Sequence, residues 1–234
     1  MIDENFNATV FGATSLLGKS IIKFKPKKFV YISRKKINQK KIKWIKFSLS
    51  KKKIITKKKI QIGIFLISPR YLSKNFNKKT YEKEYSLLKK IFYLYRFKKF
   101  IYISSPTIFQ KNHPIGSVKK KCEEFLIKNS KKFENLQIWR PYNLVGIDHK
   151  NLSDHFHNLL FKEIFIKKKI NPIFFGCKYD ERGYSDVDNF IKVVLVQSKK
   201  NISFVKNYGN KKSIKIIEIL KIFNDSFYKI RGKN

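Results

Sequence analysis

A short glycine-bounded segment near the start of the chain has the residue types and the spacing of a phosphate-binding turn. Residues 12–18 read Gly-Ala-Thr-Ser-Leu-Leu-Gly and lie between an apolar stretch and a run of helical periodicity. A dinucleotide site needs small residues there, because the chain must turn tightly and let a pyrophosphate approach the backbone N–H groups of a helix N-terminus. We therefore predict a dinucleotide site with these cofactor contacts: Gly12, Thr14, Ser15, Leu16, Leu17 and Gly18.

The middle of this turn departs from the usual glycine pattern. Ser15 occupies the position where a dinucleotide-binding turn normally has a glycine. Its hydroxyl can still donate a hydrogen bond to a phosphate, but its Cβ narrows the approach of that phosphate. A plain strand–helix turn that holds no ligand is the alternative interpretation.

A basic residue stands at the position that distinguishes NADP from NAD. Arg34 follows Gly12 by 22 residues, at the end of the second expected strand. An acidic residue there would bind the ribose hydroxyls of NAD, whereas an arginine favours the 2′-phosphate of NADP. Lys35 and Lys36 add positive charge. The expected cofactor is therefore NADP or NAD, with NADP preferred.

Other residues with reactive side chains give weaker patterns. His155 and His157 are two residues apart, so on a helix they point to different faces, and no third metal ligand is evident. Cys122 lies in an expected helix with no histidine near it in the sequence, which favours a buried, inert thiol. Two cysteines are too few for a disulfide framework or a four-ligand zinc site. No metal is expected.

Short apolar runs alternate with longer amphipathic ones, a pattern typical of βαβ units around a parallel sheet. The expected strands are 8–11, 29–32, 42–47, 60–67, 100–103, 136–139, 173–175 and 202–205. The expected helices are 16–24, 80–96, 117–128, 154–165, 187–197 and 213–223. The pattern predicts an α/β fold, a Rossmann-type doubly wound sheet of about seven strands. Residues 1–150 form the expected dinucleotide-binding domain, and 151–234 a small lobe on the substrate side that contributes elements back to that domain.

Composition and charge narrow the class of protein. The 234 residues include 54 Lys+Arg and 16 Asp+Glu, for a formal net charge of +38, and 42% are hydrophobic, which is enough for a core. No apolar run reaches the roughly 18–20 residues of a membrane span, so we expect a cytoplasmic protein. Only six of the basic residues are arginine, and the lysines are spread along the chain. Codons of an AT-rich genome explain much of this lysine, and the charge predicts only non-specific attraction to polyanions.

Five segments, taken in chain order, resemble motifs of the extended short-chain dehydrogenase/reductase superfamily, in particular its NAD-dependent epimerase/dehydratase-like members. They are residues 9–18, 100–109, 139–146, 182–188, and 207–209 followed by Glu218. The resemblance implies that Ser105 and Lys119 are catalytic, and that Lys119 also holds the nicotinamide ribose of the cofactor. It implies substrate contacts from three further residues: Thr107, Asn143 and Arg182.

The resemblance breaks at the residue that transfers the proton. The family places Tyr-x-x-x-Lys on a helix, where the i, i+4 spacing puts both side chains on one face. With Lys119 aligned, the tyrosine position falls on Ile115, and with Lys120 aligned it falls on Gly116. Neither residue can transfer a proton. A tyrosine from elsewhere in the fold, Tyr142 or Tyr102, would have to substitute, and the sequence gives no reason to expect it.

Three functions remain open from the sequence. The first is an NAD(P)-dependent epimerase, dehydratase or reductase, an oxidoreductase or isomerase acting on a nucleotide-activated sugar or a similar metabolite. The second is a non-catalytic NAD(P)-binding protein that serves as a redox sensor or a partner subunit. The third is a polyanion-binding module on an inherited fold. The family resemblance also implies a homodimer formed through the helices at 80–96 and 117–128.

Overall fold

Two compact units are recognised in the computed structural model. The structure describes residues 8–25, 27–37, 42–47, 60–68, 78–146, 160–168, 181–209 and 212–231. Unit 1 comprises Met1–Pro141 and Val187–Tyr208, and unit 2 comprises Tyr142–Asp186 and Gly209–Asn234. Within the described ranges, no helix combines the length and the apolar character needed to cross a bilayer.

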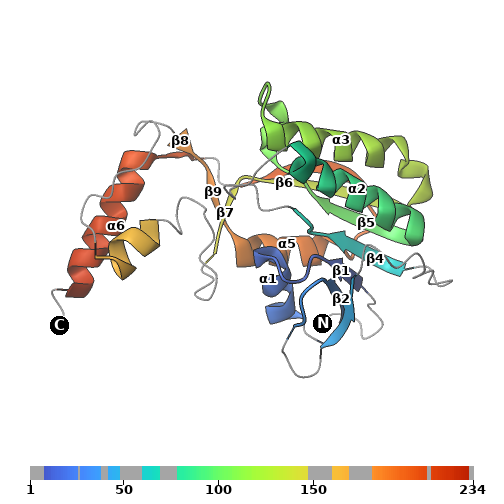
Figure 1. Cartoon of the computed structure of the whole chain (residues 1–234), viewed down its shortest axis with the longest axis horizontal. Helices are drawn as coiled ribbons and strands as arrows, with labels where there is room; N and C mark the ends of the chain where they lie inside the picture. Colours follow the sequence, from blue (N-terminus) through green and yellow to red (C-terminus); the bar gives the residue numbers. More distant parts are fainter. Residues whose placement is uncertain are drawn as a thin grey trace. The chain divides into compact units, whose positions relative to one another are not determined.

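Unit 1 is built on a seven-stranded sheet with the order β10-β6-β5-β4-β1-β2-β3, in which every pair is parallel (Figure 1). Its strands are β1 (Ala8–Phe11), β2 (Phe29–Ser33), β3 (Lys43–Lys46), β4 (Ile60–Phe65), β5 (Phe97–Ile103), β6 (Asn135–Pro141) and β10 (Phe204–Tyr208). The strand order reverses between β1 and β4, which is the switch point where α/β sheets bind ligands. The predicted Rossmann-type fold is confirmed.

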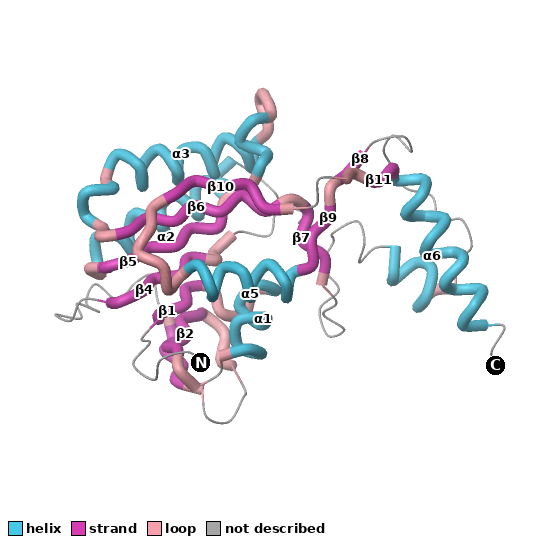
Figure 2. The backbone as a smooth tube through the Cα atoms, turned by 180° about the vertical axis from the view of Figure 1, so that it is seen from behind, coloured by secondary structure: helices cyan, strands magenta, loops and turns pink. Residues whose placement is uncertain are grey.

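Helices cover both faces of this sheet. Helices α1 (Leu16–Phe24) and α5 (Val187–Gln197) lie on one face, and α2 (Lys78–Leu94) and α3 (Pro114–Lys128) lie on the other (Figures 1 and 2). Two short 3₁₀ helices, η1 (Pro106–Phe109) and η2 (Ser130–Lys132), flank α3. Helix α3 begins three residues before the predicted 117, because Pro114 suits the first helical turn, where its missing N–H has no partner to lose.

Residues 187–208 belong to unit 1 and pack on its sheet through an aromatic cluster. The ring of Trp139 on β6 lies 4.9 Å from Phe204 on β10 and 5.9 Å from Phe190 on α5. The ring of Phe190 lies 4.9 Å from Tyr208. Strand β10 therefore begins at 204, two residues later than predicted, where its side chains reach Trp139.

Unit 2 consists of short elements. Strand β7 (Asn143–Val145) pairs in parallel with β9 (Tyr184–Asp186), and β8 (Glu181–Arg182) pairs with β11 (Ile214–Lys215). Helix α6 (Ile216–Arg231) packs on the π-helical turn η3 (Lys162–Ile166) through Ile164, Ile219 and Phe227. Helix α6 thus replaces the helix predicted at 213–223, and the predicted strand at 173–175 lies outside the described residues.

Close aromatic packing leaves no room beside one strand glycine. A Cβ placed on Gly63 of β4 would lie 2.6 Å from the ring of Phe97, which is buried and packs 4.9 Å from Phe100. We expect Gly63→Ala to lower the free energy of unfolding by about 1–3 kcal/mol, the usual range for an overpacked core. Urea unfolding of the full chain measures it, with Val196→Ala on the exposed face of α5 as the control. Equal stabilities of the two variants would contradict this packing.

Candidate functional site

The predicted phosphate turn lies at the switch point of the sheet. Gly12 follows β1 with a φ of 92°, and its N–H donates to the carbonyl of Ile32 at 3.0 Å. A Cβ on Gly12 would lie 3.0 Å from the backbone of residues 66 and 67, and one on Gly18 would lie 2.4 Å from the carbonyl oxygen of Ala13. Both positions therefore require glycine, and the turn keeps the close backbone approach that a pyrophosphate needs.

Ser15 acts inside the turn as the N-cap residue of α1. Its Oγ accepts a hydrogen bond from the Gly18 N–H at 3.1 Å. A helix N-terminus offers such N–H groups to a phosphate, so Ser15 occupies one donor that a cofactor would otherwise use. The sequence predicted a hydroxyl that donates to phosphate, and it did not predict this internal acceptor role.

The end of β2 presents the predicted basic residues to solvent. The buried hydroxyl of Ser33 donates to the carbonyl of Lys35 at 2.6 Å and accepts from Trp44 Nε1 at 2.8 Å. This turn leaves Arg34 and Lys35 exposed directly after the strand. Because β2 pairs with β1, Arg34 follows the strand next to the one that leads into the glycine turn.

Ser105 and Thr107 meet at the carboxyl end of β5. Ser105 is the N-cap of η1, and its Oγ accepts from the Thr107 N–H at 3.3 Å and from the Thr107 hydroxyl at 3.0 Å. The neighbouring Ser104 is buried and donates to Glu123 on α3. The structure thus brings together the two hydroxyls that the sequence assigned to catalysis and to substrate binding.

Lys119 is buried between α3, α2 and β5. Its Nζ donates to Glu84 Oε1 at 2.7 Å and to the carbonyl of Ile103 at 2.9 Å, and lies 5.1 Å from the ring centre of Tyr102. The Tyr102 hydroxyl also donates to Glu84 Oε1, at 2.8 Å. Burial, with the Glu84 charge beside it, raises the pKa of Tyr102 well above its usual value. Tyr102 therefore stays protonated and is closed to solvent, so it is a poor substitute for the missing tyrosine.

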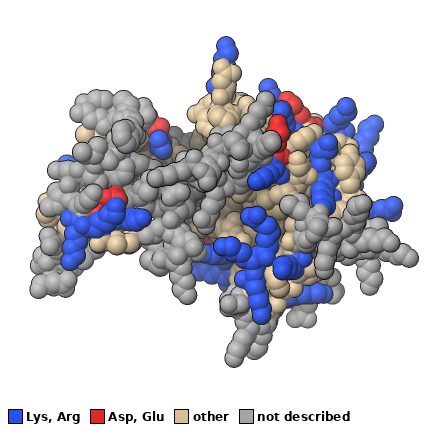
Figure 3. All heavy atoms as spheres, in the orientation of Figure 1, with Lys and Arg blue, Asp and Glu red and all other residues tan. Residues whose placement is uncertain are grey.

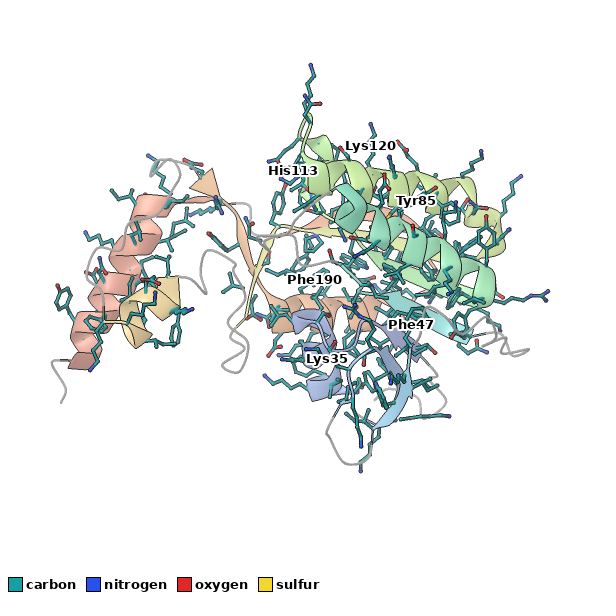
Figure 4. The ribbon with its side chains drawn as sticks, viewed as in Figure 1. Lys35, Phe47, Tyr85, His113, Lys120 and Phe190 are labelled. Carbon is teal, nitrogen blue, oxygen red and sulfur yellow. The ribbon has the colours of Figure 1, made fainter. Side chains whose placement is uncertain are left out.

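The positions one turn before Lys119 and Lys120 carry no proton donor. Ile115 is half-buried in the first turn of α3. A Cβ on Gly116 would lie 2.1 Å from the carbonyl oxygen of Thr107, so the helix backbone touches η1 there and excludes any side chain. His113 caps the same turn, where its Nδ1 accepts from the Gly116 N–H at 3.2 Å (Figure 4).

A second buried ion pair was missed by the sequence analysis. Arg140 on β6 contacts Glu123 through Nε at 3.0 Å and through Nη2 at 2.5 Å, and its guanidinium lies 5.0 Å from the ring centre of Phe109. One signal was available in the sequence. The chain has few acidic residues, and a carboxylate among the apolar positions of a helix needs a buried partner of opposite charge. Burial also raises the pKa of Cys122, the residue before Glu123 in α3, to about 12, which is consistent with the inert thiol expected there.

The predicted substrate contacts Asn143 and Arg182 both belong to unit 2. Asn143 Nδ2 donates to the carbonyl of Gly183 at 3.0 Å, directly beside Arg182 in the chain. The cofactor-turn residues, Arg34, Ser105, Thr107 and Lys119 belong to unit 1. The predicted site residues are therefore divided between the two units. The histidines at 155 and 157 lie outside the described residues.

Comparison with known proteins gives the same fold. No protein-family model and no curated sequence relative matches the chain. UDP-N-acetylglucosamine 4-epimerase from Bacillus cereus matches with a TM-score of 0.75 and 14% identity, over 95% of this chain and 84% of that one. ADP-L-glycero-D-manno-heptose-6-epimerase from Helicobacter pylori matches with 0.74 and 16%, over 97% and 84%. RMD from Pseudomonas aeruginosa, complexed with NADPH, matches with 0.67 and 15%, over 95% and 84%. The resemblance to epimerase/dehydratase-like proteins is confirmed at the level of the fold.

The cap at Ser15 gives a prediction about cofactor affinity. Ser15→Gly releases the Gly18 N–H and removes the Cβ, so we expect it to tighten NADPH binding about 3- to 10-fold. Ser15→Ala releases the same N–H but keeps the Cβ, and we expect an intermediate affinity. Fluorescence titration of the three proteins measures the order. A weaker affinity for Ser15→Gly than for the wild type would contradict it.

The buried pair predicts a stability effect on α3. Lys119→Met leaves Glu84 charged and without its ammonium partner, so we expect it to lower the free energy of unfolding by about 3–5 kcal/mol. Adding Glu84→Gln to Lys119→Met should recover part of that loss, because the two side chains are coupled. Urea unfolding measures the cycle, and Lys121→Met, at an exposed position of α3, is the control. Similar losses for Lys119→Met and Lys121→Met would exclude a stabilising pair.

Proposed function

We propose that this chain binds NADP or NAD, and that it does so without the tyrosine-dependent proton transfer that its family resemblance implies. The observation that carries the proposal is the glycine turn at the switch point of a Rossmann sheet. Gly12 has a left-handed backbone, and Gly18 lies against the carbonyl of Ala13. These residues fit a dinucleotide, because a side chain at either position would fill the space that the turn needs.

A preference for NADP is supported by the charge at the end of β2. Arg34 and Lys35 are exposed there, and Arg34 stands at the position where an acidic side chain would favour NAD. The planar guanidinium of Arg34 suits bidentate binding of a phosphate. The similar RMD fold holds NADPH.

The proposed lack of catalytic turnover is supported by the residues of α3, the helix that would carry the Tyr-x-x-x-Lys pair. A bound nicotinamide would supply reversible hydride transfer. Ile115 cannot exchange a proton with a substrate hydroxyl, and Lys119 uses its ammonium for Glu84 and the carbonyl of Ile103. Such a protein would serve as a redox sensor or as a partner subunit.

A second candidate is an NAD(P)-dependent epimerase, dehydratase or reductase acting on a nucleotide-activated sugar. The hydroxyl pair of Ser105 and Thr107 at the end of β5 favours it, as do the epimerases that share the fold. Ser105 would then bind a substrate oxygen, Asn143 and Arg182 would contact the nucleotide sugar, and another acid/base would replace the tyrosine. A homodimer through α2 and α3 stays a prediction.

Separate titrations with NADPH and NADH, monitored by nicotinamide fluorescence at about 150 mM salt, test the proposal. We expect micromolar binding of NADPH and roughly tenfold weaker binding of NADH, because only NADPH offers a 2′-phosphate to Arg34. Arg34→Ala should remove most of this preference, whereas Lys120→Ala, at an exposed position of α3 (Figure 4), should keep it. No binding of either dinucleotide would overturn the proposal.

Turnover distinguishes the two candidates. UDP-glucose or UDP-N-acetylglucosamine is added, and the absorbance of the bound nicotinamide is monitored. Sugar products are analysed by chromatography. We expect neither a change in the nicotinamide nor an epimerised sugar. Turnover that is lost in Ser105→Ala would favour the enzyme over the non-catalytic protein.

A further inference from the structure

The first third of the chain has an unusual distribution of charge. Residues 5–81 contain 22 lysines and arginines and no aspartate or glutamate, whereas 14 of the 16 acidic residues follow position 81. A chain-wide enrichment in lysine does not by itself remove carboxylates from one stretch. This stretch supplies β1, β2, β3, β4 and α1, so one half of the sheet carries charge of a single sign.

Six exposed cations of this half form a surface that we call the basic edge. They are Lys27, Arg34, Lys35, Lys36, Lys43 and Lys46. Strand β3 is the outermost strand on this side, and its Lys43 and Lys46 lie in register with Val30 and Ser33 of β2. The basic edge therefore includes both ends of the β2–β3 pair, about 10 Å apart along the strands, and Lys43 and Lys46, which are three residues apart, lie on opposite faces of β3. Lys and Arg gather over this region in the space-filling view (Figure 3).

No carboxylate in the described part of the chain forms an ion pair with these six residues. The acidic residue of the helix layer on this side, Asp188 of α5, is held by the Lys23 ammonium at 2.6 Å and by the Ser20 hydroxyl at 2.6 Å. Those bonds lower the pKa of Asp188 against the effect of its partial burial. Positive charges that lie close together repel one another and destabilise the folded state. An anionic partner would relieve this repulsion, so a surface of this kind favours binding of an external polyanion.

Two simpler roles explain only part of the basic edge. The 2′-phosphate of NADP accounts for Arg34 and a neighbour at the carboxyl end of β2, but Lys27 and Lys43 lie at the opposite end of the strand pair. Lysines on an edge strand also prevent pairing with another sheet. That role accounts for Lys43 and Lys46. The two roles together leave Lys27 and one of the pair Lys35 and Lys36 without an explanation.

We propose that the basic edge binds the phosphate backbone of a nucleic acid without reading its sequence. A linear polyanion can reach cations that are spread over about 10 Å of an edge, and the release of its counterions favours each contact. Five of the six residues are lysines, which contact phosphates as point charges, whereas base edges are read mainly by bidentate side chains such as arginine. An anionic membrane fits less well, because Ile45 is the one large apolar residue exposed among the described residues from 8 to 68.

The test compares two variants of the full chain that lose the same charge. The edge variant replaces Lys27, Lys35, Lys36, Lys43 and Lys46 by Gln and keeps Arg34. The control variant replaces five other exposed lysines of unit 1 by Gln: Lys121, Lys128, Lys131, Lys199 and Lys200. Binding of a fluorescent duplex of about 25 base pairs and arbitrary sequence is measured by anisotropy from about 50 to 300 mM salt.

The wild type should bind the duplex with a steep salt dependence, whatever its sequence. The edge variant should bind about 100-fold more weakly at about 100 mM salt, and its log–log salt slope should be flatter by about 4, because each lost phosphate contact removes about 0.9. The control variant should lose less than about fivefold. Circular dichroism checks that both variants remain folded. Titration with NADH checks that the dinucleotide site is intact, because NADH lacks the 2′-phosphate that Lys35 and Lys36 would attract.

Several results would overturn the proposal. Equal losses in the two variants would mean that total charge alone attracts the duplex. Displacement of the duplex by NADPH at its own Kd would assign these cations to the cofactor. Tight binding to phosphatidylcholine/phosphatidylserine vesicles that depends on the same five lysines, without duplex binding, would assign the surface to a membrane. Since Arg34 is kept, failure of nucleic-acid binding with intact NADPH binding leaves the dinucleotide proposal standing.

Discussion

The helix layer over β5 depends on the buried contact between the Lys119 ammonium and the Glu84 carboxylate. Both side chains are buried, so the desolvation of each charge is offset by the other charge 2.7 Å away and by the hydrogen bonds that Tyr102 and Ser68 donate to Glu84. The pair joins α3 to α2, and the second bond of Lys119, to the carbonyl of Ile103, joins both helices to the end of β5. Arg140 and Glu123 repeat this arrangement between β6 and α3. Substitutions in α2 therefore reach the end of β5, where the candidate hydroxyls lie.

The same contact gives Lys119 a structural role that does not depend on catalysis. The lysine of the expected Tyr-x-x-x-Lys pair is present at position 119, and its neighbour on the same helix face is Ile115. An ammonium that neutralises a buried carboxylate stabilises the fold whether or not it takes part in catalysis. The lysine by itself is thus weak support for catalysis.

The sequence predicted well the helices and strands whose bounds depend on residues close together in the chain. The bounds of β1, α1 and α5 agree with the predicted 8–11, 16–24 and 187–197, because apolar runs and the glycine turn mark them locally. The contact of Lys119 with Glu84 joins residues 35 positions apart, and the pattern along the chain gives no sign of it. The capping bond of Ser15 depends on the orientation of a hydroxyl, which sequence spacing does not specify.

The cap at Ser15 has a consequence for how the protein behaves between encounters with its cofactor. Because the Gly18 N–H is already satisfied, the first turn of α1 is ordered in the free protein and does not wait for a phosphate. Ligand binding then adds only the stabilisation given by its own occupancy. Each dinucleotide then meets a turn that is already folded, so little conformational entropy is lost when it binds.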